Sequence, residues 1–311
     1  AIIGHTFPVE SERNRAWAIW GTIMGVTMML APIIGGVVAF SLSWRWAFYI
    51  NVPICILLTT AAIPLIEESG DAQTRRLDPA GIVFFTASMF GLTWGLVNGQ
   101  AHGWTSASAL IGFVGSAISL ACFVLAERMQ TRPMLDLQLF SNSRFVAAVW
   151  AMFAYAAAAQ VMASMLPLLL QNGLGCSALE AGFSMLPFAL AMLLFPHVGR
   201  LLGSHFTSRH ILALGLVLVG IGNGVTAFGA YFVAWSTIMV GMLVLGAGGG
   251  LLNGETQKAI MSVVPRERAG MASGISTTSR FAGILLSFAT LSGILATVVR
   301  REFPDRSAAF G

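Results

Sequence analysis

Long stretches without a charged residue constrain this 311-residue chain more than any other feature. Between Arg15 and Arg45 there are 29 uncharged residues in a row, and between Asp78 and Glu127 there are 48. A helix needs about 20 mostly apolar residues to cross the roughly 30 Å hydrocarbon core of a bilayer. Only 10% of the chain is charged, whereas soluble domains carry about 25%. The sequence therefore predicts an integral membrane protein.

The charge-free intervals predict an all-α fold with nine membrane-spanning helices. Their approximate positions are 16–40, 46–66, 79–97, 105–126, 145–168, 180–198, 211–229, 233–254 and 270–299. The longest interval holds two of these helices, with a break expected at 98–103.

The distribution of Lys and Arg predicts the orientation of these helices. One set of alternate loops carries twelve basic residues, while the opposite set of internal loops carries Arg45 alone, with three more in the tail. Because cytoplasmic loops are rich in Lys and Arg, we expect 67–78 and 127–144 to be cytoplasmic and 98–104 to be external.

The sequence shows no cluster that favours catalysis or metal binding. Cys55, Cys122 and Cys176 are far apart, so neither a disulfide framework nor a zinc site is expected. No paired acids, His cluster or Ser/His set lies near one membrane face, so we expect no enzyme, cofactor or metal, and no nucleic-acid partner. The chain starts at Ala1 without an initiator Met or a leader, and we interpret it as a fragment.

Two segments far apart in the chain repeat one pattern. Residues 8–16 and 265–272 both run from Pro through Glu and Arg into small residues that open a predicted span. Both spans run from inside to outside in the predicted topology. This echo favours two bundles related by a parallel repeat, a construction known among transporters.

The first predicted span carries a motif of small residues and proline, followed by Trp44-Arg45-Trp46 and Asn51-Val52-Pro53. The motif residues are Gly25, Ala31, Pro32, Gly35 and Gly36. This pattern resembles the fifth-helix antiporter motif and the start of the sixth helix in the major facilitator superfamily. The specific match is to its 14-span drug:proton antiporter family.

The resemblance implies a major-facilitator helical bundle in which the chain corresponds to helices five to thirteen. Residues 1–66 would end the N-terminal bundle with two spans, 67–144 would hold two extra central spans with cytoplasmic loops, and 145–311 would supply five spans of the C-terminal bundle. Nine helices do not close two six-helix bundles, so we expect no transport by the fragment alone.

The implied function is proton-driven export of small amphipathic molecules by alternating access, in a multi-pass protein of a bacterial-type inner membrane. Its partners would be the substrate, protons and the lipid bilayer, and a periplasmic adaptor stays an open question. A substrate-specific exporter or importer is an alternative with the same fold. A membrane-embedded enzyme and a structural membrane protein are alternatives of other classes.

The segment 199–206 resembles the family's gating loop but lacks its Asp. The candidates for gating residues are Gly199 and Arg200 in this segment and Arg209 just after it. In the motif helix, Thr27 and Ala31 stand where the family usually has Gly.

Arg280 is the most informative single residue, because it lies about ten residues, or roughly 15 Å, into the last predicted span. An Arg at the membrane centre costs at least about 2.5–3.5 kcal/mol, so it should face a polar cavity or a partner. Other polar residues recur at helical spacing on the same helix: Ser273, Ser276, Thr277 and Ser287. We expect Arg280, Ser276 and Thr277 to line a central cavity. A structural tie to backbone carbonyls is the alternative.

Three further features are candidates for function. Glu255 is a candidate proton carrier, although a solvated Glu at the membrane interface is the alternative that we favour. Gln160, Ser164, Pro167 and Gln171 recur at spacings that place them on one helix face. Substrate contact by Gln160 and Ser164 is weighed there against hydrogen bonding between helices. The glycine-rich run 246–250 lacks the ending of a phosphate-binding loop and favours close helix packing.

Overall fold

The computed structural model describes residues 9–43, 45–65, 79–129, 137–264 and 269–302, together with residues 3, 6 and 7. These residues form helices joined by turns, and no strand occurs among them. Eight helical segments of this described part are long and apolar enough to cross a membrane. The predicted all-α membrane fold is confirmed.

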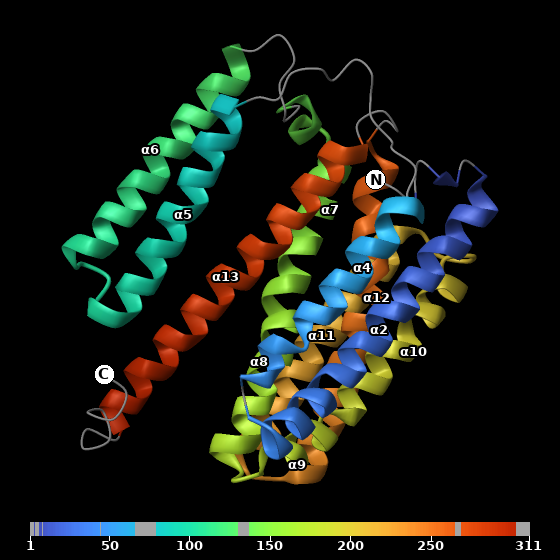
Figure 1. Cartoon of the computed structure of the whole chain (residues 1–311), viewed down its shortest axis with the longest axis vertical. Helices are drawn as coiled ribbons and strands as arrows, with labels where there is room; N and C mark the ends of the chain where they lie inside the picture. The colour runs from blue at the N-terminus through green and yellow to red at the C-terminus, as the bar shows by residue number, and fades with distance from the viewer. Residues whose placement is uncertain are drawn as a thin grey trace.

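The helices fall into three consecutive groups (Figure 1). The first contains α2 (Glu10–Ser41), α3 (Trp46–Tyr49) and α4 (Asn51–Leu65). The second is a hairpin of α5 (Pro79–His102) and α6 (Ala107–Met129). The third contains η1 (Leu137–Ser141), α7 (Ser143–Tyr155), η2 (Ala156–Gln160), α8 (Val161–Leu168), η3 (Leu169–Gly173), α9 (Ala178–Ser184), α10 (Leu186–Leu202), α11 (Ser208–Tyr231), α12 (Trp235–Ser262) and α13 (Ala269–Glu302). The segments η2 and η3 are π-helical.

The predicted spans and the structure agree closely but not in every detail. The eight candidate spans overlap the last eight predicted ones, and several extend further, as α12 does to Ser262. The first predicted span, 16–40, lies within the 32-residue helix α2, which is not among the eight.

The helix break predicted at 98–103 is wrong, because α5 continues to His102. The side-chain amide of Asn98 donates to the Trp94 carbonyl within the same helix at 3.0 Å. That of Gln100 donates to the Ala289 carbonyl of α13 at 2.9 Å. The chain turns at Gly103, whose φ of +95° suits glycine. The amides of Asn98 and Gln100 therefore bind helix carbonyls, and these two residues do not end α5.

Helix α12 is the centre of the third group, and 61% of its most apolar stretch is buried. Its glycine-rich run packs directly on its neighbours. A Cβ atom built on Gly248 would lie 2.7 Å from the Gly215 carbonyl oxygen of α11, and one on Gly250 would lie 2.9 Å from the Cβ of Phe195 in α10. Such distances leave no room for side chains, so the prediction of close packing is confirmed.

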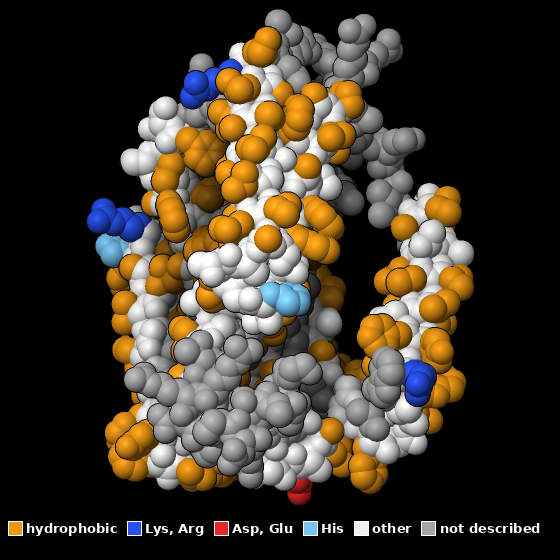
Figure 2. All heavy atoms as spheres, turned by 90° about the vertical axis from the view of Figure 1, so that its left-hand side faces the viewer, with side chains coloured by type: hydrophobic (Ala, Val, Ile, Leu, Met, Phe, Trp, Pro, Cys, Tyr) orange, Lys and Arg blue, Asp and Glu red, His pale blue; other side chains and the backbone are white. Residues whose placement is uncertain are grey.

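The other two groups are less enclosed. Helix α2 lies against α9 and α10, whereas no residue in the apolar stretch Trp46–Pro64 is buried. The α5–α6 hairpin stands beside α13 and away from the other helices (Figure 1). Hydrophobic side chains are spread over the described surface on the face that Figure 2 shows, and charged ones are few, as expected for a protein surrounded by lipid.

Helix directions follow the predicted topology. In Figure 1 the end of α6 and the beginnings of α7 and α13 lie at the top, while the α5–α6 turn and the end of α13 lie at the bottom. The helix ends assigned to the cytoplasm thus lie together, although which side faces the cytoplasm stays a prediction.

Candidate functional site

Three polar side chains lie near one another at the middle of the membrane-spanning helices. Tyr155 and Gln160 lie near the centre of the span Ser143–Gly173, and Arg280 lies near the centre of the span Gly270–Leu295. The Tyr155 ring is fully buried, with the Gln160 amide beside its hydroxyl and the Arg280 guanidinium within electrostatic range. We call these residues the mid-membrane polar cluster.

Each member of the cluster has a buried polar atom without a hydrogen-bond partner among the described residues. These atoms are the Tyr155 hydroxyl oxygen, Gln160 Oε1 and Arg280 Nε. Buried polar groups are normally paired, because leaving one unpaired costs free energy. The cluster is therefore suited to a ligand that offers both a hydrogen-bond acceptor and a donor.

The π-helical turn η2 explains how Tyr155 and Gln160 come together. Residues five positions apart lie about 140° apart around an α-helix, but the i→i+5 bonding of a π-turn places them one above the other. Neighbouring helices stabilise this turn through its carbonyls. The Ser287 hydroxyl of α13 donates to the Ala157 carbonyl at 2.7 Å, and the Asn223 amide of α11 donates to the Ala158 carbonyl at 3.2 Å.

The polar residues predicted to share one face of α13 have different surroundings in the structure. Ser276 is buried and its hydroxyl donates to Gln257 Oε1 of α12 at 2.5 Å, while Thr277 is exposed. Ser287 is used at η2, as described above. Of the residues predicted to line a cavity, Gln160 and Arg280 therefore both lie near Tyr155, whereas Ser276 and Thr277 have other surroundings.

The polar face predicted from 160 to 171 is also divided. Ser164 is exposed, and its hydroxyl donates to the Gln160 carbonyl of its own helix at 3.3 Å. Pro167 and Gln171 instead line a cavity of about 320 Å³ between α2 and α9. Gln171 lies in the π-helical segment η3, which changes the register at the end of this face, so the α-helical spacing does not hold there.

Glu255 is buried, which corrects the expectation of a solvated side chain. Its exposed fraction is 9%, and it lies within α12, which continues to Ser262 and packs against neighbouring helices. Oε2 lies 3.6 Å from Nζ of the exposed Lys258, while Oε1 is buried without a partner among the described residues.

The motif helix α2 packs closely on α9 and α10. A Cβ atom on Gly36 would lie 2.9 Å from the Ala178 carbonyl oxygen, and one on Gly25 would lie 3.0 Å from the Cα of Leu193. The Ala31 side chain is exposed, and no atom lies within 4 Å of a Cβ on Gly35. The side chain of Pro32 is outside the described residues.

The gating-loop candidates are in different surroundings. Gly199 is buried, and a Cβ atom there would lie 3.3 Å from the Leu251 side chain of α12. Arg200 and Arg209 are exposed, and neither forms an ion pair with another described residue. No group of three His, Cys, Asp or Glu side chains suited to a metal occurs within the described ranges.

Sequence reasoning missed Tyr155 and Asn223. Tyr155 directly precedes η2, which alters the helical register there, and Asn223 of α11 binds the Ala158 carbonyl, which is 65 residues away in the chain. The pair His197 and Thr22 was also missed: Nε2 and Oγ1 lie 3.4 Å apart and connect α10 to α2.

Comparison with known proteins identifies relatives along nearly the whole chain. The profile of the Major Facilitator Superfamily matches residues 1–288. The multidrug resistance protein Stp of Mycobacterium tuberculosis is 31% identical over 95% of this chain and 55% of its own length. The tetracenomycin C resistance and export protein of Streptomyces glaucescens is 29% identical over 97% of this chain and 56% of its own length. The multidrug efflux pump LfrA of Mycolicibacterium smegmatis is 28% identical, with 96% and 59% covered. The chain thus spans little more than half the length of these relatives.

Proposed function

Because the chain belongs to the major facilitator superfamily, a family of transporters and not of enzymes, we propose that the full-length protein exports small amphipathic molecules in exchange for protons. The relatives named as multidrug resistance and efflux proteins support this proposal. They are bacterial, which supports an inner-membrane location for this multi-pass protein.

The mid-membrane polar cluster is the observation that carries the proposal. A charged side chain at this depth is expensive and usually marks a substrate or ion pathway. Arg280 Nε, the Tyr155 hydroxyl and Gln160 Oε1 offer donors and acceptors that no described residue uses. Met152 and Ala156, which are close to Tyr155 in the sequence of the same span, are also buried. An amphipathic molecule can place a polar group on the cluster and apolar surface against such neighbours.

Alternating access would proceed by movement along the contact between α2 and α9–α10. In this proposal, 1–66 and 145–311 belong to opposing bundles, and 67–144 is the pair of extra spans in a 14-span protein. Gly25 and Gly36 would let the bundles close tightly, because their missing side chains permit backbone contact.

Glu255 is our candidate for the proton-carrying residue within this chain. A carboxylate inside a membrane protein is costly when charged, and such residues form proton relays in transporters. Burial, together with the unpartnered Oε1, supports Glu255 over the exposed Glu180.

A substrate-specific exporter is the second candidate. It is favoured by the relative named for tetracenomycin C resistance and export. The two candidates differ in how many unrelated compounds compete for transport.

The proposal is tested with the full-length protein in proteoliposomes carrying an imposed pH gradient. We expect accumulation of several unrelated amphipathic dyes that collapses when a protonophore removes the gradient. Transport of one compound alone would favour the second candidate, and no proton-dependent flux of any compound would overturn both.

A further inference from the structure

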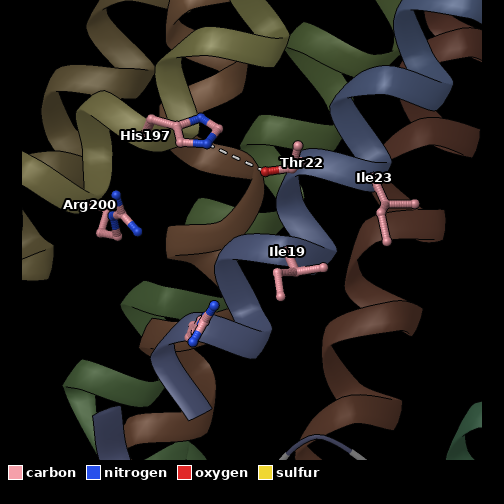
Figure 3. Close-up of a pocket in the computed structure, with 6 residues that line it drawn as sticks. Ile19, Thr22, Ile23, His197 and Arg200 are labelled. Carbon is pink, nitrogen blue, oxygen red and sulfur yellow. Dashed lines mark hydrogen bonds between the residues drawn. The ribbon is translucent and has the colours of Figure 1, made fainter. Parts of the chain in front are cut away.

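A basic cavity of about 300 Å³ lies between α2 and α10, separate from the mid-membrane polar cluster (Figure 3). Its lining residues are Arg15, Ile19, Thr22 and Ile23 of α2, and His197 and Arg200 of α10. The four residues of α2 follow the spacing of one helix face. Figure 3 shows the Arg200 and His197 side chains on one wall and Ile19 and Ile23 on the facing helix.

The cavity lies at one end of two antiparallel helices. Gly25 packs on Leu193, whereas Thr22 contacts His197, so residue numbers rise along α10 as they fall along α2. Arg15 is five residues after the first residue of α2, and Arg200 is two residues before the end of α10. Both guanidinium groups therefore lie at the same end, which the Lys and Arg distribution assigns to the cytoplasm.

The charges in the cavity are unbalanced. Two arginines and a histidine line it, and none of the six lining residues is acidic. Neither arginine forms an ion pair with another residue of the described ranges. Arg suits phosphate groups, because its planar fork of donors forms paired hydrogen bonds to two oxygens.

Apolar side chains beside these charges distinguish a lipid from a soluble anion. The exposed fractions of Ile19 and Ile23 are 54% and 59%, although both line the same cavity as Arg15. A free phosphate would gain nothing from apolar contact with this surface, whereas the acyl chains of a phospholipid would bury it away from water. Basic pockets between membrane helices on the cytoplasmic side are suited to anionic headgroups.

We propose that this cavity binds the phosphate of an anionic phospholipid from the cytoplasmic leaflet, between Arg15 and Arg200. The bound phosphate connects α2 to α10 at their cytoplasmic ends. If these helices belong to opposing bundles, which rests on the proposed function, the lipid holds the cytoplasmic side closed and its removal changes the transport rate.

The test measures lipid binding and transport separately on the full-length protein. Native mass spectrometry of detergent-solubilised protein with added phosphatidylglycerol or phosphatidylcholine reports binding. We expect the double variant Arg15→Gln/Arg200→Gln to lose phosphatidylglycerol binding by about tenfold, because each basic side chain adds attraction to an anionic lipid. Arg128→Gln, which removes an exposed arginine outside the cavity, should bind phosphatidylglycerol as the wild type does.

Three results would overturn the proposal. The first is equal binding of phosphatidylglycerol by the double variant, and the second is equal binding of phosphatidylcholine by the wild type. The third is competition by millimolar inorganic phosphate that displaces the lipid completely, which would identify a soluble anion as the ligand. Dye flux by the wild type in proteoliposomes separates the two proposals: lipid binding without flux contradicts the export function, and flux without lipid binding contradicts the lipid site.

Discussion

Gly36 of α2 packs on the backbone of Ala178 at the beginning of α9, where a Cβ atom would lie 2.9 Å from the Ala178 carbonyl oxygen. At the adjacent Gly35, no atom lies within 4 Å of the equivalent position. Two neighbouring glycines of one motif therefore differ in whether they can accept a side chain, and this difference gives a matched pair of variants.

We expect Gly36→Leu to reduce efflux by about tenfold or more, because the added side chain pushes α2 away from α9. Gly35→Leu should export at close to the wild-type rate. Dye efflux from cells at matched expression measures both. Equal activity of the two variants would show that close packing at Gly36 has no role in transport.

We expect Arg280→Gln to reduce efflux by about tenfold or more, since a neutral amide cannot replace a desolvated cation. Arg280→Lys should be partly active, because Lys keeps the charge but lacks the planar donors of Arg. The control is Phe281→Leu, which alters an exposed side chain on the same helix. Wild-type efflux by Arg280→Gln would mean that the residue does not contribute to transport.

Tyr155→Phe separates a binding role from a structural one. The Tyr155 hydroxyl has no hydrogen-bond partner among the described residues, so its removal should leave thermal stability unchanged or slightly higher. Apparent affinity for dyes should weaken if the hydroxyl binds substrate. Thermal denaturation in detergent and concentration-dependent efflux measure the two effects. A lower melting temperature with unchanged affinity would indicate a purely structural hydroxyl.

The beginning of α9 is stabilised by a capping box between Ser177 and Glu180. The Ser177 hydroxyl accepts from the Glu180 N–H at 3.3 Å, and the Glu180 carboxylate accepts from the Ser177 N–H at 2.8 Å. We expect Ser177→Ala to lower the free energy of unfolding by about 1 kcal/mol. The control is Ser236→Ala, at an exposed position in the first turn of α12. Thermal denaturation compares the two, and equal melting temperatures would contradict a stabilising cap.

Membrane sidedness is tested by cysteine labelling in a background without Cys55, Cys122 and Cys176. Ser106→Cys, at the α5–α6 turn, should react with an impermeant maleimide added outside intact cells. Met129→Cys, at the exposed end of α6, should react only after the membrane is opened. The reverse pattern would invert the predicted topology.

The sequence was sufficient to predict the helices because each apolar run is long and the charges between runs are few. It also identified Gly25 and Gly36, since small residues at a helix interface leave a local pattern. It failed where tertiary contacts decide local structure. Asn98 and Gln100 looked like a helix break, yet their amides bind carbonyls of α5 and α13 and permit the helix to continue.

The mid-membrane polar cluster also depends on tertiary contacts that leave no local sequence pattern. The sequence identifies Arg280 from its depth alone but not its neighbour Tyr155, because the two residues come near each other only through the packing of α13 on α7. The sequence predicts that Glu255 is solvated, because the predicted span ends at residue 254. The observed helix continues past it and buries the side chain.

The π-helical turn η2 also affects how this span should be aligned and mutated. A π-turn contains one residue more than an α-turn, which is equivalent to about 100° of rotation on a helical wheel. A wheel drawn from Ser143 therefore assigns residues after Gln160 to the wrong side. In an alignment, a relative without the bulge would need a one-residue gap within 156–160, and its residue opposite Gln160 would otherwise be misidentified. Alanine scanning of α8 should be interpreted from a wheel that starts at Val161.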